Sequence, residues 1–220
     1  MASPDDENGR LSYADYWDGR YTETVKGEEQ VHEWLRSFED LEEFLNRRLF
    51  QAYPPAAEPH IVHLGSGDST IPQHLAAKGY HRQLCVDFSA VVVKTMSQRH
   101  ADLGLSDVIR WEMIDVRHMD SIADASVDVA FDKSTLDVMI HGSPWNPPDD
   151  TVKNTGEYLR EVSRILKPSG VYLSVTYRQP HFVKPLLECK GTNWNIEIEH
   201  LGAGGSFGYY AIICKPLPRS

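Results

Sequence analysis

From residue 60 onward, short apolar runs alternate with longer segments of helical character. The runs at 60–64, 82–88, 109–115, 127–133 and 171–177 predict strands, and the segments at 69–78, 89–103 and 151–166 predict helices. Strands that alternate with helices of this length are joined by right-handed crossovers, which build a parallel sheet with helices on both faces. The alternation therefore predicts an α/β fold.

The end of the chain follows a different pattern. Two further runs, 194–201 and 208–215, are separated only by the glycine-rich residues 202–206. This connection is too short for a crossover helix and predicts a hairpin, so the last strand should run antiparallel. We therefore expect a Rossmann-like sheet of seven strands, mostly parallel with an antiparallel last strand. The length of 220 residues suits a single domain over 1–220, with residues 60–215 as its core.

The N-terminal part carries weaker signals. Residues 1–10 are polar and predict a disordered tail. The stretch YADYWDGRY at 13–21 is dense in aromatic residues. Apolar residues at three- and four-residue steps predict a helix from Glu28 to Phe50, which the Pro54-Pro55 pair then interrupts.

Charge and composition restrict the class of partner. A formal net charge of −10 argues against direct nucleic-acid binding and is compatible with a small molecule or a basic protein. No apolar run is long enough to cross a membrane, and the start of the chain is too polar for a signal peptide. The three cysteines lack CxxC spacing, which favours free thiols in a reducing compartment, so we expect a cytoplasmic protein.

Metal binding is not expected from the ten scattered histidines. His60 and His63 are three residues apart on a predicted strand, so their side chains point to opposite faces. Structural or surface roles are the better interpretation.

The sequence LGSGDS at 64–69 ends the first strand of the alternating part. Gly65 and Gly67 remove side chains so that a ligand can approach the backbone, and the next helix offers free N–H groups. In such sheets, ligands bind beyond the carboxyl ends of the strands. Asp87 ends the second strand, where a carboxylate can accept hydrogen bonds from two ribose hydroxyls. The pattern predicts a cofactor that contains adenosine, with a plain strand–helix turn as the alternative.

Two classes of cofactor fit the glycine turn. A dinucleotide site would carry a third glycine at position 70, where this chain has Thr70. The third strand ends in Asp115, which can accept a hydrogen bond from an adenine amino group, and Val116, which can pack on the adenine ring. The stretch RILKPSGVYLSV at 164–175 adds a helix end, a turn and a buried strand.

Together these features resemble the class I S-adenosylmethionine-dependent methyltransferases over residues 60–215. The flanking segments YWDGRY, EWL, VDFSAVVVKTM, MIDVR and FDKSTLDVM resemble more closely a eukaryotic methyltransferase-like family that includes lysine methyltransferases of elongation factor 1-alpha. The chain departs from that family's LGCGNS, which is LGSGDS here, and from its KGTLD, where Ser134 replaces glycine.

The resemblance implies S-adenosylmethionine as cofactor, S-adenosylhomocysteine as product, and residues 11–55 as a cofactor-capping segment. Aromatic faces attract the cationic sulfonium of this cofactor, although core packing is an alternative role for the aromatic residues. The implied cofactor-binding residues are Trp17, Tyr21 and Trp34 at the methionine end, Gly65 and Gly67 in the turn, Asp87 and Phe88 at ribose and adenine, Asp115 and Val116 at adenine, and Lys133 near the methyl-transfer centre.

The resemblance favours a protein-lysine methyltransferase, with elongation factor 1-alpha as candidate substrate. A small-molecule N-, O- or S-methyltransferase and an inactive cofactor-binding scaffold are the alternatives, because a fold does not fix the acceptor. An acceptor lysine, with an ordinary pKa of about 10.4, must lose a proton before attack. Asp132, Asp137 or a water path could assist, and no catalytic base is assigned. The loop at 141–150 is expected over the acceptor site, with Trp145 at the substrate, or else is an ordinary surface loop.

Overall fold

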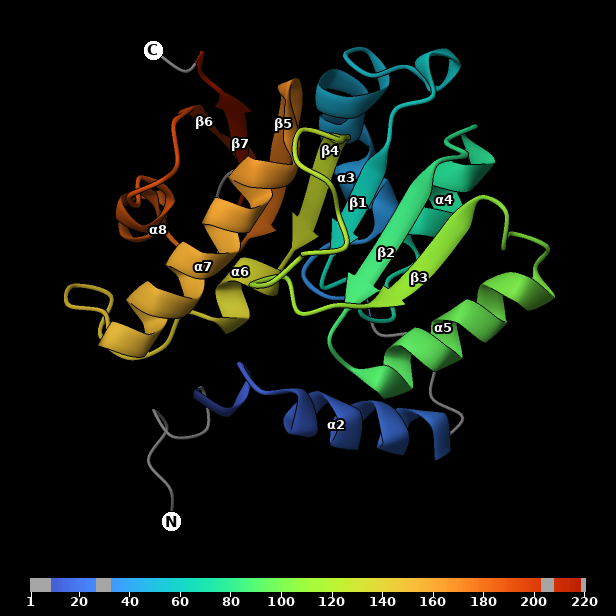
Figure 1. Cartoon of the computed structure of the whole chain (residues 1–220), viewed down its shortest axis with the longest axis horizontal. Helices are drawn as coiled ribbons and strands as arrows, with labels where there is room; N and C mark the ends of the chain where they lie inside the picture. Colours follow the sequence, from blue (N-terminus) through green and yellow to red (C-terminus); the bar gives the residue numbers. More distant parts are fainter. Residues whose placement is uncertain (1–8, 27–32, 203–207, 219–220) are drawn as a thin grey trace.

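The computed structural model describes residues 9–26, 33–202 and 208–218 and contains one seven-stranded sheet. The strand order is β3-β2-β1-β4-β5-β7-β6, in which β1 to β5 are parallel and β7 runs antiparallel to both of its neighbours. This arrangement confirms the predicted Rossmann-like fold (Figure 1). The strands are β1 (Ile61–Leu64), β2 (Gln83–Asp87), β3 (Ile109–Met113), β4 (Val127–Lys133), β5 (Leu166–Thr176), β6 (Trp194–Leu201) and β7 (Tyr209–Pro216).

The central strands are apolar on both faces because helices cover both sides of the sheet. Every residue of β1 and β2 is buried. Leu64, at the end of β1, lies opposite Val86 of β2 and Asp132 of β4. The carboxyl ends of these three strands therefore lie at the same edge of the sheet.

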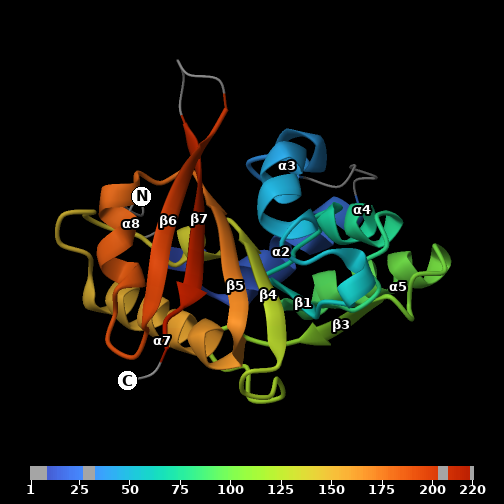
Figure 2. The ribbon, with the colours of Figure 1, turned by 90° about the horizontal axis from the view of Figure 1, so that it is seen from above.

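Helices cover the two faces of the sheet in separate groups (Figures 1 and 2). One face is covered by α7 (Asp149–Ile165) and α8 (Pro180–Leu187), whose apolar residues pack with Val62, Leu64 and Ile212. On the other face lie α3 (Phe38–Leu45), the π-helical turn η1 (Asn46–Phe50), α4 (Ile71–Ala77) and α5 (Ala90–Asp102). Ser89 is the N-cap of α5, and its side chain accepts a hydrogen bond from the Val92 N–H.

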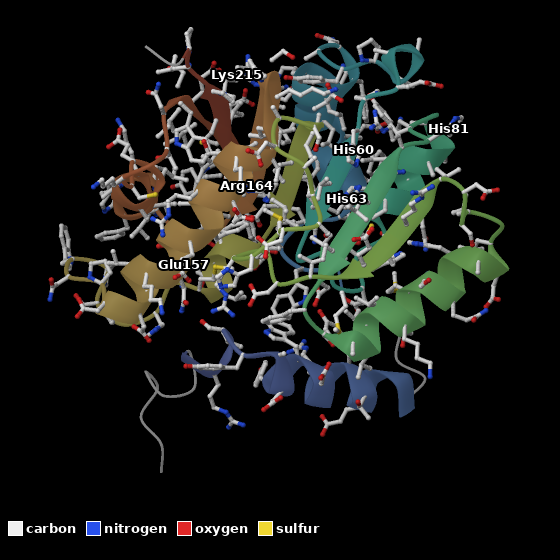
Figure 3. The ribbon with its side chains drawn as sticks, viewed as in Figure 1. His60, His63, His81, Glu157, Arg164 and Lys215 are labelled. Atoms are coloured by element: carbon white, nitrogen blue, oxygen red, sulfur yellow. The ribbon has the colours of Figure 1, made fainter. Side chains whose placement is uncertain are left out.

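The long helix α7 is held in place by both apolar and polar contacts. Tyr158, Leu159, Val162 and Ile165 form its buried stripe. Arg164 on the same helix (Figure 3) donates to the carbonyls of residues 119 and 122 across the connection between β3 and β4. This network fixes the segment that follows β3.

The predicted helix from Glu28 to Phe50 is wrong in its first part. Residues 27–32 lie outside the described residues, residues 33–37 are not helical, and the helix α3 begins at Phe38. Ser37 is the N-cap, and its side chain and Asp40 form a reciprocal capping box. The apolar spacing of Trp34 and Leu35 matched a helical period by chance.

Several further elements differ from the prediction. The helices α2 (Ala14–Lys26), α6 (Thr135–Val138) and α8 and the 3-10 turn η2 (Pro55–Ala57) were not predicted. β5 begins at Leu166, which pairs with Val127 before the register shifts. The predicted tail falls largely on residues 1–8, and most of the predicted hairpin turn on 203–207; both stretches lie outside the described residues. Within the described part of the chain, no helix is long and apolar enough to cross a bilayer.

Candidate cofactor-binding site

One pocket lies at the carboxyl ends of the parallel strands. It is lined by the ends of β1, β2 and β4, by the residues after β3, by α2 and by Trp34. Figure 1 shows α2 crossing below the tips of these strands. The lining includes all ten residues predicted to bind a cofactor: Trp17, Tyr21, Trp34, Gly65, Gly67, Asp87, Phe88, Asp115, Val116 and Lys133.

The glycine turn after β1 requires its glycines. Gly65 and Gly67 have φ angles of 59° and 53°, in the left-handed region that glycine adopts without strain. A Cβ atom on Gly65 would lie 2.4 Å from Oγ1 of Thr135, and one on Gly67 would lie 2.8 Å from the hydroxyl of Tyr21. The Thr135 hydroxyl donates to the Leu64 carbonyl at 2.7 Å, which fixes the turn against α6.

Asp87 ends β2 and organises the glycine turn from the neighbouring strand. Its carboxylate accepts hydrogen bonds from the N–H groups of Gly67 and Ser89, each at 3.0 Å. Burial raises the pKa of Asp87 to about 6, although these two N–H groups favour its charged form. Each carboxylate oxygen retains lone-pair capacity for a ligand hydroxyl.

Asp115 lies beyond β3 with its carboxylate paired to Arg117. The guanidinium donates to both carboxylate oxygens, at 2.6 to 3.1 Å, and the Arg117 N–H donates at 2.9 Å. Burial alone would raise the pKa of Asp115, but the hydrogen bonds from Arg117 outweigh it and hold the pKa below its usual value. Arg117 also lines the pocket and was not predicted.

Trp17, Tyr21 and Trp34 form an aromatic wall. Trp17 lies 5.8 Å from Tyr21 and 6.0 Å from Trp34, measured between ring centroids. Val92 and Met96 of α5 pack behind Trp17 and Tyr21. These residues therefore combine core packing with a pocket-lining position.

Lys133, at the end of β4, is buried and ion-paired. Its ammonium lies 2.6 Å from Oε1 of Glu33 and donates to the Trp34 carbonyl at 2.7 Å. Burial lowers the pKa of Lys133, and the charge of Glu33 opposes that shift. Glu33 belongs to the EWL segment, and its pairing with this lysine was not predicted from the sequence.

Ser134, the residue that replaces glycine in the resembled family, has a φ of 77°. This left-handed conformation favours glycine, so serine is strained at this position. Ser134 also lines the pocket. The backbone here adopts the glycine-like conformation in spite of the substitution.

The two carboxylates considered for proton transfer are engaged elsewhere. Asp132 accepts hydrogen bonds from the hydroxyls of Tyr158 and Tyr172 and from two N–H groups of α6. Asp137 accepts from the Thr176 hydroxyl, and burial raises its pKa to about 7. Neither residue is part of the pocket lining.

The predicted loop at 141–150 ends at residue 148, because Asp149 and Asp150 already belong to α7. It presents Trp145, whose surface is 80% exposed. The Trp145 ring packs edge-on against Phe182 of α8, with 4.9 Å between the ring centroids. The loop follows β4 and α6, and α8 follows β5, so both belong to the sheet edge that carries the pocket.

The histidines in the first part of the sheet have hydrogen-bond partners within the protein. His60 directly precedes β1 and contacts the Ser126 carbonyl, and His63 lies in β1 and contacts the Gln83 side chain (Figure 3). Burial lowers the pKa of His63 to about 4, so this ring is neutral at pH 7. Among the described residues, no group of three or more His, Cys, Asp or Glu side chains could hold a metal ion.

Known proteins resemble the chain both in sequence and in structure. The family described as "Methyltransferase domain" matches residues 57–206. EEF1A lysine methyltransferase 4 of Mus musculus is 31% identical over 207 residues, which cover 93% of this chain and 76% of that protein.

Two solved structures share the fold at low sequence identity. The [4+2]-cyclase SpnF has a TM-score of 0.65 at 13% identity, with 93% of this chain and 96% of that chain covered. Geranyl diphosphate C-methyltransferase from Streptomyces coelicolor, solved with S-adenosyl-L-homocysteine, has a TM-score of 0.57 at 17% identity, with 98% and 99% covered. From its sequence matches, the chain belongs to the methyltransferase domain family and is a relative of EEF1A lysine methyltransferase 4.

Proposed function

We propose that this protein transfers the methyl group of S-adenosylmethionine to a lysine side chain of a protein, with elongation factor 1-alpha as the first candidate substrate. The observation that carries the proposal is a single pocket that combines the glycine turn, Asp87, Asp115 and the aromatic wall. Membership of the methyltransferase family supports methyl transfer. The name of the mouse relative supports a lysine of EEF1A as acceptor.

The residues present fit the proposed cofactor. Gly65 and Gly67 line the pocket without side chains, and a Cβ at either position would collide with Thr135 or Tyr21. Asp87 would hold the ribose hydroxyls, Asp115 the adenine amino group, and Val116 would pack on the ring. Trp17, Tyr21 and Trp34 would surround the methionine end.

S-adenosylmethionine, when bound, supplies a methyl group that its positive sulfur already activates for displacement. The protein's contribution is therefore positioning and exclusion of water. Trp17 and Tyr21 are at most 8% exposed, so α2 presents a water-excluding surface to the pocket. Aromatic faces near a cation contribute roughly 0.5–2 kcal/mol each.

The acceptor lysine must be neutral when it attacks. We assign no general base, because the carboxylates of Asp132 and Asp137 accept hydrogen bonds within the protein and neither residue lines the pocket. Removal of the lysine amine from water lowers its pKa and favours the neutral form. The acidic balance of the chain, −10, favours a basic protein as the partner.

We place this activity in the cytoplasm as part of the same proposal. Cys85, Cys189 and Cys214 are free thiols, which suits a reducing compartment. Fluorescence microscopy of the tagged protein tests this location, and accumulation in an oxidising compartment would contradict it.

The decisive experiment incubates the protein with tritiated S-adenosylmethionine and either purified elongation factor 1-alpha or a cell lysate. The proposal predicts label in a protein, and mass spectrometry should locate it on a lysine. Label only in the small-molecule fraction would favour a small-molecule methyltransferase, and no label in either fraction would favour an inactive scaffold. Asp87→Ala provides the matched control, which should transfer at least 10-fold less label.

A further inference from the structure

We propose that Glu33 is a positioning residue that fixes the methionine end of the cofactor pocket from behind its lining. The inference rests on the proposed function, because it names what orders the binding site for S-adenosylmethionine. It starts from one carboxylate that connects three separate parts of the chain. These parts are the segment 33–37, the start of α4 and the end of β4.

Both oxygens of the Glu33 carboxylate are used. Oε1 accepts from the Ser69 hydroxyl at 2.7 Å and lies 2.6 Å from the Lys133 ammonium. Oε2 accepts from the N–H and the hydroxyl of Thr70, at 2.8 Å and 2.7 Å. Thr70 precedes α4, so the carboxylate also satisfies a donor at a helix start, where negative charge is favourable.

Glu33 does not line the pocket, but three residues that it orders do. Trp34, Ser69 and Lys133 all belong to the lining. Glu33 precedes Trp34 in the chain, bonds Ser69 and pairs with Lys133. The side chain therefore acts on the ligand through its neighbours.

The backbone beside Glu33 is held in an unusual conformation. The Arg36 N–H donates to the Trp34 carbonyl at 2.7 Å, which closes a γ-turn around Leu35 with a φ of 61°. A positive φ is costly for leucine and persists only where surrounding contacts impose it. The same Trp34 carbonyl accepts from Lys133, and Glu33 holds that ammonium in place.

Loss of the carboxylate would leave Lys133 as a buried, unpaired ammonium. The Lys133 side chain is 5% exposed and the Glu33 side chain 17%. Removal of one partner of a buried ion pair lowers the stability of the fold more than removal of both partners. Lys133 would then shift toward water or another acceptor, and the Trp34 carbonyl would lose the hydrogen bond that it accepts from Lys133.

The test compares Glu33→Gln, Glu33→Asp and the matched surface control Glu42→Gln. Glu42 pairs with Lys78 at the same 2.6 Å but is 52% exposed. Titration calorimetry with S-adenosylhomocysteine should show at least 10-fold weaker binding for Glu33→Gln, partial recovery for Glu33→Asp, and a change below 2-fold for Glu42→Gln. In methyl-transfer assays, KM for S-adenosylmethionine should rise about 10-fold while kcat changes less than 3-fold.

A double variant, Glu33→Gln with Lys133→Met, separates positioning from folding. Because it removes both charges, its thermal midpoint should return toward the wild-type value while binding of S-adenosylhomocysteine stays weak. Recovery of binding together with stability would overturn the positioning role, as would wild-type affinity in Glu33→Gln. A wild-type protein that binds no S-adenosylhomocysteine would instead contradict the proposed function itself.

Discussion

Gly65 and Gly104 share a left-handed backbone but differ in what a side chain would meet. Their φ angles are 59° and 70°, yet a Cβ on Gly65 would lie 2.4 Å from Thr135 whereas one on Gly104 would meet nothing within 4 Å. Gly104→Ala should therefore cost only the conformational penalty of roughly 1–2 kcal/mol. Gly65→Ala should lower the free energy of unfolding by at least about 3 kcal/mol and abolish binding of S-adenosylhomocysteine.

Urea denaturation and calorimetry measure both effects. Gly104→Ala serves as the control, since it shares the backbone strain and lies outside the pocket lining. Equal losses of stability in the two variants would contradict the role assigned to Thr135 as the neighbour that forbids a side chain.

Asp87 makes the affinity for the cofactor depend on pH. Burial raises its pKa to about 6 in the folded protein, so the carboxyl is increasingly protonated below that pH. A protonated carboxyl loses acceptor capacity for the ribose hydroxyls, and the affinity for S-adenosylmethionine should fall as the pH drops from 7.5 to 5. Since the folded-state pKa lies above the unfolded one, the same group favours folding most at low pH, and this contribution is lost as the pH rises through about 6.

Calorimetry of wild type, Asp87→Asn and the exposed control Asp107→Asn across this pH range is the measurement. Asp87→Asn should bind at least 10-fold more weakly at pH 7.5, with a flatter dependence on pH. Asp107→Asn should follow the wild type. A wild-type affinity that is constant between pH 5 and 7.5 would rule out an ionised Asp87 at the ribose.

Residues in the strand-end motifs could be predicted, but their partners could not. Asp87 follows a recognisable strand at a fixed distance from the glycine turn, so its position at the pocket was predictable. Glu33 and Lys133 are far apart in the sequence and meet only through the fold. Arg117 was missed because a basic residue two positions beyond an acid is an ordinary surface pattern.

At the scale of elements, α2 forms one wall of the pocket. It packs on α5 through Trp17 and Tyr21, and its Asp18 accepts from the Ser89 hydroxyl. Binding of S-adenosylhomocysteine should slow hydrogen exchange in α2, because the ligand adds contacts to these rings. Exchange in the edge strand β6 should not change. Hydrogen exchange with mass spectrometry checks this, and unchanged α2 amides would contradict a capping role.

Helices and strands were predictable where burial gives their apolar residues a regular spacing. They were missed where the residue types within a segment gave conflicting indications. The strands β4 and β6 match their predicted bounds because each reads as one uninterrupted run. α2 was missed because aromatic and polar residues alternate without a clear apolar stripe and Gly19 interrupts it. α8 was not predicted, and it contains Pro180 and Pro185, a residue type unfavourable inside helices; Pro180 occupies the first turn, where proline is tolerated.

At the scale of the whole molecule, the charge of −10 predicts a salt-sensitive encounter with a basic protein. Raising the salt from 50 to 300 mM should lower kcat/KM for a basic protein substrate about 10-fold by screening. The affinity for S-adenosylmethionine should change less than 2-fold, because its site is largely buried. Steady-state kinetics at several salt concentrations test this, and a rate that rises with salt would exclude an electrostatically guided substrate.

The core of the fold could be predicted as a whole because one constraint governs it. Parallel strands buried on both faces must be apolar, and their crossovers must be right-handed, so the order of runs determines the sheet. The N-terminal segment follows no such constraint. Its structure depends on contacts such as Glu33 with Thr70 and Asp18 with Ser89, which only the assembled sheet brings together.

A crystal structure of the protein with S-adenosylhomocysteine would test the proposed cofactor site. We expect the ribose hydroxyls within hydrogen-bond distance of Asp87, adenine beside Asp115 and Val116, and the homocysteine sulfur facing Trp17, Tyr21 and Trp34. An empty pocket at saturating ligand, or a ligand bound at another surface, would contradict it.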